Sequence, residues 1–108
     1  MPHSNGLLPS KLIRRFAEIG SQKETENAVV VTKFFSPRSR WAWYATEYDP
    51  ATKTFYGLVN GAFPEFGTFS LDEIQSDPIH GPDIERALVW KEQGVAQVFA
   101  ALLDGRLM

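Results

Sequence analysis

Three carboxylates stand where a small sheet could bring them together. Glu47 and Asp49 are two residues apart in "ATEYD", and Glu65 follows on a neighbouring predicted strand. Residues i and i+2 of a strand share a face, so Glu47 and Asp49 are expected to point the same way. Such a pair can perform general acid–base catalysis or, with Asp72 or Glu85 as a third ligand, bind a hard cation. Charged residues at strand ends are more often solvated, and we predict no metal and no cofactor.

Other catalytic signatures are weak. His80 lies in the predicted loop "PIHGP", and His3 lies near the N-terminus. The chain has no cysteine, which excludes disulfides, Cys-based zinc sites and thiol catalysis. Its glycines form no phosphate-binding fingerprint. The sequence therefore favours a non-enzymatic protein, with a metal-dependent enzyme built on the three carboxylates as an alternative.

A second candidate is the stretch "KFFSPRSRWAWYATEYD" (33–49), which combines aromatic side chains with arginine. On a surface, these aromatics could stack on bases or fill a partner's pocket, and the basic residues could contact phosphates or carboxylates. In a sheet, the same rings could form the core, because aromatic residues bury the largest area. The candidate binding surface consists of Lys33, Arg38, Arg40, Trp41, Trp43, Tyr44, Tyr48 and Lys53.

The alternation of residues 41–48 is the main reason to predict an interaction surface. In an extended strand, Trp41 and Trp43 share one face, and Tyr44 and Tyr48 share the other. One layer of helices covers only one of these faces. The other needs a second helix or a partner, which we expect to be a protein, with single-stranded nucleic acid as the alternative.

Two further groups of charges have weaker functional readings. Lys11, Arg14 and Arg15 decorate the exposed side of the first predicted helix, where they could contact nucleic acid or an acidic partner. Arg86 could pair with Glu85 or bind an anion. For both groups we favour an ordinary solvated or structural role.

The hydrophobic pattern predicts an α+β fold. Runs rich in β-branched and aromatic residues, separated by turns such as "SPRSR" and "DPATK", predict an antiparallel meander of about four strands. Apolar residues at helical spacing predict helices packed on the sheet. The strands are expected at 28–35, 41–48, 54–60 and 65–69, and the helices at 10–19, 71–76 and 94–103, with "ALVW" (87–90) as a further strand.

Local signals predict where the helices begin and end. Ser10 is a plausible N-cap of the first helix, and Gly20 stands where a left-handed C-terminal residue is favoured. Ser70 and Glu73 have the spacing of a capping box. Gly105 is expected to end the last helix, whose apolar surface makes a homodimer through 94–103 possible.

The chain of 108 residues is expected to form a single domain over 1–108. Residues 1–8 and 106–108 are expected to fray, and 21–27 forms a polar connector. No secretory signal and no apolar stretch long enough to cross a bilayer is visible, which favours a cytoplasmic protein with no membrane partner. The net charge of −2 predicts no strong attraction to nucleic acid.

Four runs of the chain resemble a known family: "KFFSPRSRWAWYATEYD", "FYGLVNG", "EFGTFSLDEI" and "DIERALVW". Over roughly residues 9–92 the chain is similar to the domain-of-unknown-function family DUF2958, small proteins of bacteria, plasmids and phages. The resemblance implies the sheet with its helices, but no activity. It also implies an origin on mobile elements, which by analogy suggests a target in host defence, such as a CRISPR or restriction complex blocked by occlusion. Ala87, where the family carries an acidic residue, and a helix at 94–108 are expected departures.

Overall fold

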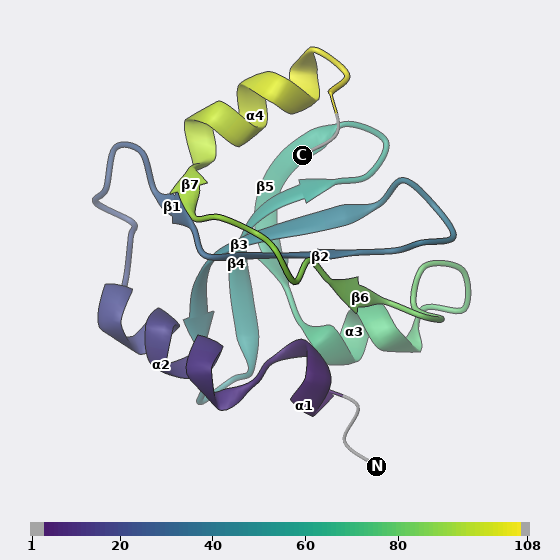
Figure 1. Cartoon of the computed structure of the whole chain (residues 1–108), viewed down its shortest axis with the longest axis horizontal. Coiled ribbons are helices and arrows are strands. Elements are labelled where there is room, and N and C mark those ends of the chain that lie inside the picture. The colour runs from purple at the N-terminus through teal and green to yellow at the C-terminus, as the bar shows by residue number, and fades with distance from the viewer. Residues whose placement is uncertain (1–3, 107–108) are drawn as a thin grey trace.

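The chain folds into an antiparallel meander with helices on both of its faces (Figure 1). The computed structural model describes residues 4–106. The strands are β1 (Val29–Val30), β2 (Thr32–Phe35), β3 (Ala42–Asp49), β4 (Thr54–Asn60), β5 (Pro64–Phe69), β6 (Glu85–Arg86) and β7 (Gln93–Gly94). The helices are α1 (Ser4–Leu7), α2 (Ser10–Ile19), α3 (Leu71–Ser76) and α4 (Val95–Leu103). The α+β class and the meander predicted from the sequence are confirmed.

Strand β3 lies at the centre of the main sheet, whose order is β5–β4–β3–β2–β6. The predicted strand 28–35 is divided at Val31. Its first part, β1, pairs with β7 in a separate two-stranded sheet, and its second part, β2, pairs with β3. Val31 lies between the two parts, and its backbone N–H donates to the carbonyl of Ala45 in β3 at 2.8 Å.

A bulge in β3 changes which side chains share a face. The register between β3 and β4 shifts between Ala45 and Glu47. The extra residue is Thr46, whose hydroxyl donates to the Tyr56 carbonyl at 3.1 Å. Tyr48 therefore packs on the same side of the sheet as Trp43. The prediction that Tyr48 shares a face with Tyr44 is wrong, because one inserted residue inverts the alternation beyond it.

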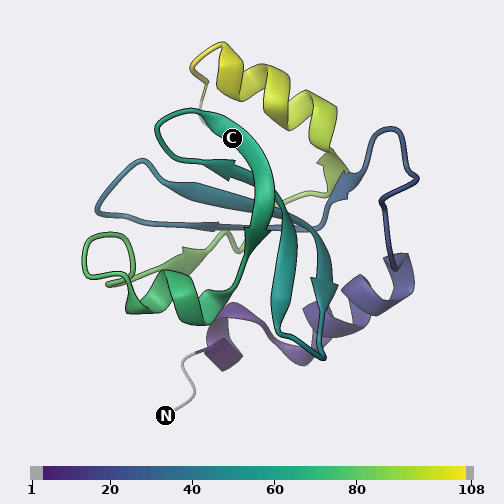
Figure 2. The same ribbon diagram turned by 180° about the vertical axis from the view of Figure 1, so that it is seen from behind.

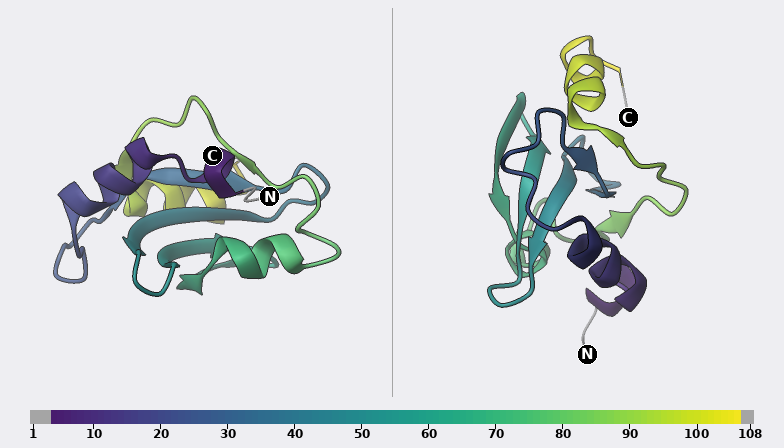
Figure 3. Two further views of the ribbon diagram at one scale, coloured as in Figure 1. Left: turned by 90° about the horizontal axis from the view of Figure 1, so that it is seen from below. Right: turned by 90° about the vertical axis from the view of Figure 1, so that its left-hand side faces the viewer.

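The predicted strand "ALVW" is also wrong. Pairing with β2 ends after β6, where the Ala87 N–H donates to the Lys33 carbonyl, and the chain then turns at Leu88 and Val89. Both of these apolar side chains are strongly exposed. The segment between β6 and β7 stands out from the body of the molecule (Figure 3).

The two faces of the sheet carry separate apolar cores. One face packs against α1, α2 and α3, and its core includes Phe16, Trp43 and Phe55. The opposite face packs against α4, and its core includes Tyr44 and Val98. In Figures 1 and 2 the sheet accordingly runs between α4 and the other three helices.

The local helix signals are mostly confirmed. Gly20 follows α2 with φ +67°, and the capping box of Ser70 and Glu73 opens α3. Gly105, with φ +77°, follows α4. The N-cap prediction for Ser10 is off by one residue. Pro9 occupies that position with an extended backbone and no side-chain hydrogen bond.

The described part of the chain begins with helix α1. Helix α1 lies in the stretch expected to fray, and its Leu7 is buried in the core. His3, together with the ends at 1–3 and 107–108 that we expect to fray, lies outside the described residues. Over residues 4–106, no helix has the length and apolar character needed to cross a bilayer.

The packing of α4 can be tested by two neighbouring leucines. Leu102 is 8% exposed and Leu103 is 64% exposed. Leu102→Ala should lower the free energy of unfolding by about 2–5 kcal/mol, because it leaves a cavity beneath α4. Leu103→Ala should change it by less than about 0.5 kcal/mol. Urea unfolding of both variants measures the difference, and equal effects would show that α4 does not use this face.

Burial also gives the fold an alkaline limit. Desolvation raises the pKa of the Tyr44 phenol to about 12. In the unfolded chain it ionises near pH 10. Between pH 10 and 12 the unfolded state therefore holds fewer protons than the folded state, and the free energy of unfolding falls as the pH rises.

Tyr44→Phe should reduce this alkaline decline by at most about 2–3 kcal/mol, as followed by urea unfolding between pH 9 and 12. Part of the slope should remain, because desolvation also raises the pKa of Tyr48. Tyr56→Phe, at an exposed position, is the control. If Tyr44→Phe leaves the alkaline fall in the free energy of unfolding unchanged, the buried Tyr44 phenol is not its cause.

Candidate interaction surface

The centre of the predicted aromatic surface is buried within the monomer. Trp43 is 5% exposed and Tyr44 is 1% exposed, each beneath the helices of its own face. Tyr48 is half-buried against Phe16 and Phe55, with ring centroids 6.0 Å and 4.5 Å away. Around Tyr44, the second face that needed a helix or a partner is therefore covered by α4, while Tyr56 and Phe66 farther along this face stay exposed.

Lys33 is held against the sheet. Its Nζ lies 5.4 Å from the ring centre of Phe35 and 5.6 Å from that of Tyr44. Partial burial lowers the pKa of the Lys33 ammonium. These contacts give Lys33 a role in covering the sheet.

The exposed members of the predicted surface are divided between opposite ends of the sheet. Arg38 and Arg40 lie in the turn between β2 and β3. Lys53 lies in the turn between β3 and β4, with φ +55°. Since β3 runs the length of the sheet between these turns, the predicted residues do not form one surface.

Three loops meet at the end that carries the arginines: 36–41, 61–63 and 77–83 (right-hand side of Figure 1). The Trp41 ring lies 4.6 Å from that of His80, whose Nδ1 is 3.2 Å from the Ser39 hydroxyl. Trp41 also lies directly over Gly61, where a Cβ would come within 2.4 Å of the indole. Glycine at this position therefore allows Trp41 to join the first two loops.

Two exposed apolar residues lie in the loops that contact this half-buried tryptophan. Phe63 is 64% exposed and Ile79 is 67% exposed. A hollow of about 350 Å³ lies between Trp41 and Phe63, and Glu65 and Phe66 also line it. We define the loop-end surface by five residues: Arg38, Arg40, Trp41, Phe63 and Ile79.

Sequence reasoning missed Phe63 and Ile79. They stand in "GAFP" and "DPIHGP", where the surrounding turn residues marked the segments as connectors. An apolar side chain between turn-forming residues cannot be buried by strand or helix periodicity. A large apolar residue inside a turn-forming segment is the signal that could have identified both.

The charges of the loop-end surface are mixed. Arg38 donates from Nε and Nη2 to Asp83 at 3.1 Å and 2.7 Å. Arg40 is exposed and makes no ion pair within residues 4–106. Glu65 brings a negative charge to the neighbouring hollow. This end therefore lacks the excess of positive charge that phosphate backbones favour.

The structure separates Glu65 from Glu47 and Asp49, and gives these two carboxylates structural partners. Glu47 accepts from the backbone N–H of Gln22 at 3.1 Å, and Asp49 accepts from that of Ala51 at 2.9 Å. Glu65 pairs across β4 with Val59, which is opposite Trp43, so it lies toward the other end of the sheet. Within the described residues, no group of three His, Asp or Glu side chains is placed to hold a metal ion.

Gln22 explains why Glu47 is tied down. Its side-chain amide donates to the carbonyls of Val29 and Thr46 at 2.9 Å and 2.7 Å and accepts from the Val29 N–H. Gln22 thus joins the connector to the bulge of β3, and Glu47 lies beside that junction. The hydrogen bond from the Gln22 N–H to the Glu47 carboxylate therefore has a structural role.

Comparison with known proteins shows the family. No curated protein and no solved structure matches the chain significantly. The family described as "Protein of unknown function (DUF2958)" matches residues 7–104. The match includes α4, so the expectation that the last helix is an addition to the family is wrong. Because the match covers nearly the whole chain, this protein belongs to the DUF2958 family.

Proposed function

We propose that the protein is a non-enzymatic interaction module that binds a protein partner through the loop-end surface. The observation that carries this proposal is the strong exposure of Phe63, which shares a hollow with the half-buried Trp41, and of Ile79, whose neighbour His80 contacts the Trp41 ring. Exposed apolar side chains gathered in one place are typical of interaction sites. Aromatic residues and arginine are also the types that contribute most to the affinity of interfaces.

The chemistry of the surface favours protein over nucleic acid. The hollow between Trp41 and Phe63 suits an apolar side chain of a partner, and the exposed Arg40, which precedes Trp41 in the sequence, suits a carboxylate. The charge of Arg38 is already balanced by Asp83, and a phosphate backbone would meet Glu65. Single-stranded nucleic acid therefore becomes the alternative outcome of the test.

The class of partner rests on the family resemblance alone. Its implied association with mobile elements makes a host defence complex, of the CRISPR or restriction type, the first partner to test. In this proposal the protein blocks the complex by occupying one of its surfaces. The choice of a defence complex is an analogy. The loop-end surface itself indicates only that the partner offers an apolar side chain and a carboxylate.

Two substitutions with matched controls test the surface. Phe63→Ala and Arg40→Ala should each weaken binding of the captured partner by at least about tenfold, because each removes an exposed anchor. Leu103→Ala removes an equally exposed apolar side chain, 64% in both cases, and Lys53→Gln removes a cation at the opposite end of the sheet. Both controls should bind like the unchanged protein.

The measurement is affinity capture from a host lysate with quantitative mass spectrometry, followed by the Kd of the purified pair. Equal binding by all four variants would reject the loop-end surface. A ligand that proves to be an oligonucleotide, with affinity falling steeply as salt is raised, would replace the protein partner by nucleic acid.

A further inference from the structure

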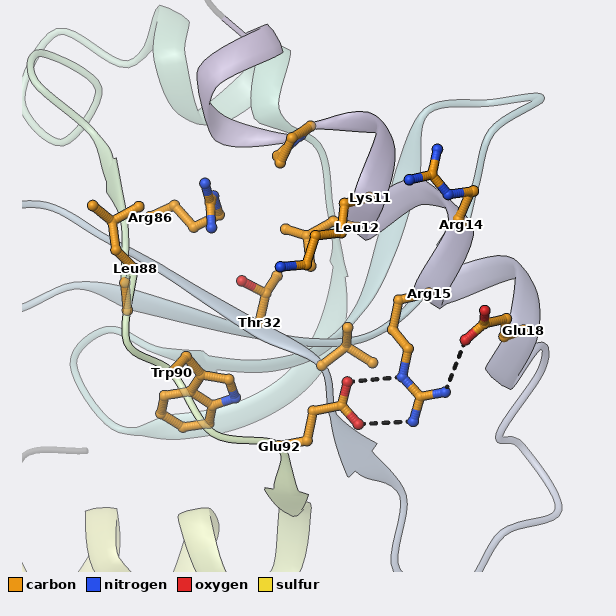
Figure 4. A pocket seen from close by; sticks show the side chains of 13 residues that line it. Lys11, Leu12, Arg14, Arg15, Glu18, Thr32, Arg86, Leu88, Trp90 and Glu92 are labelled. Atoms are coloured by element: carbon orange, nitrogen blue, oxygen red, sulfur yellow. Dashed lines mark hydrogen bonds and ion pairs between the residues drawn. The ribbon is translucent and has the colours of Figure 1, made fainter.

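A second site lies outside the loop-end surface, on the flank of the molecule. A hollow of about 510 Å³ opens between α2 and the segment that joins β6 to β7 (Figure 4). We call it the basic hollow and define it by Lys11, Arg14, Arg15, Thr32, Arg86 and Trp90. It shares no residue with the loop-end surface, so the two sites can be tested separately.

The walls of the basic hollow carry an excess of positive charge. Four cations line it, and the carboxylates there are Glu18 and Glu92, which leaves two positive charges. Arg15 is already occupied. It donates from Nε and Nη2 to Glu92, both at 2.8 Å, and from Nη1 to Glu18 at 3.3 Å (Figure 4). The cations of the hollow that make no ion pair among residues 4–106 are Lys11, Arg14 and Arg86.

Arg86 is the most informative of these residues. It lies on the edge strand β6, opposite Phe34 of β2, and its backbone is fixed by that pairing. Its Nε is buried and, within residues 4–106, has no hydrogen-bond partner. Guanidinium stays charged at all ordinary pH values, so burying this donor without an acceptor is unfavourable. The Arg86 side chain also lines the hollow, so an anion bound there would balance its charge.

Further donors lie around Arg86. The hydroxyl of Thr32 faces the same hollow, and Lys11 approaches it from α2 (Figure 4). Pro9, the N-cap of α2, lines the wall as well, so the positive end of the helix dipole adds to the field. A guanidinium, an ammonium and a hydroxyl together suit the several oxygens of a phosphate.

We propose that the basic hollow binds the phosphate of a small organic phosphomonoester. Arg86 is the principal donor, Lys11 and Thr32 complete the site, and the organic part lies against Leu88 and Trp90. A doubly charged phosphate matches the two positive charges of the walls. The volume is that of a small-molecule pocket, larger than a bare phosphate ion needs. The Trp90 indole is held in place, because its Nε1 donates to the Val30 carbonyl at 3.0 Å.

The test is a titration followed by ¹H–¹⁵N NMR, including the Nε–Hε resonances of arginine. The probes are inorganic phosphate, a nucleoside 5′-monophosphate and the matching nucleoside, added at constant ionic strength. We expect the Arg86 Nε–Hε resonance to shift saturably with the nucleotide, which should bind more tightly than inorganic phosphate. The nucleoside should produce no saturable shift at Arg86.

Substitutions separate the site from a general charge effect. Arg86→Gln should weaken nucleotide binding by at least about tenfold, since it removes a charged hydrogen bond. Lys11→Gln, at an exposed position, should weaken it several-fold without disturbing the fold, and it keeps the test valid if Arg86→Gln fails to fold. Arg40→Gln, with the same change of net charge on the loop-end surface, should bind like the unchanged protein.

Three results would overturn the proposal. The first is the absence of saturable shifts with both phosphate and nucleotide. The second is an equal loss of affinity in Arg40→Gln and Lys11→Gln, which would show unspecific attraction. The third is equal affinity for inorganic phosphate and the nucleotide, which would show that the organic part of the ligand contributes nothing to binding.

Discussion

Strand β3 carries large aromatic side chains on both faces, and both must be kept from water. Trp43 lies on one side of the sheet and Tyr44 on the other, and each is almost completely buried. A sheet with helices on a single face would leave one of these rings in solvent. The chain meets this requirement with α1, α2 and α3 on one side and α4 on the other. The inclusion of α4 in the family match fits its place as the second cover.

This two-sided burial limits where the proposed binding sites can lie. The rings at the centre of both faces are covered, so the two proposed sites lie at an end and at an edge of the sheet. At one end, Trp41 and Phe63 share a hollow at the end of the sheet that also carries the β2–β3 turn with its two arginines. At the edge, the short strand β6 brings Arg86 to a hollow below α2. The first site offers apolar area and the second offers charge, so they favour different classes of ligand.

The features of the fold that could be predicted depend on neighbouring residues in the sequence. The capping box of Ser70 and Glu73 needs only four residues, and Gly20 ends α2 through its own backbone angle. The bulge at Thr46 could not be predicted in this way. Its carbonyl is bound by Gln22, 24 residues earlier, and its effect on Tyr48 follows from a register that only the folded sheet defines. The burial of Tyr44 likewise depends on a helix about fifty residues later in the chain.

The same reasoning explains why the candidate sites were only partly visible in the sequence. Arg15 and Arg86 look alike as isolated residues, and both had been given ordinary solvated or structural roles. Folding places Arg15 against Glu92, 77 residues away, and leaves the Nε of Arg86 buried without an acceptor among the described residues. The two side chains have the same chemistry but opposite availability. Whether an arginine forms an ion pair within the fold or keeps an unpaired charge therefore depends on its tertiary neighbours, and here the two arginines line the same hollow.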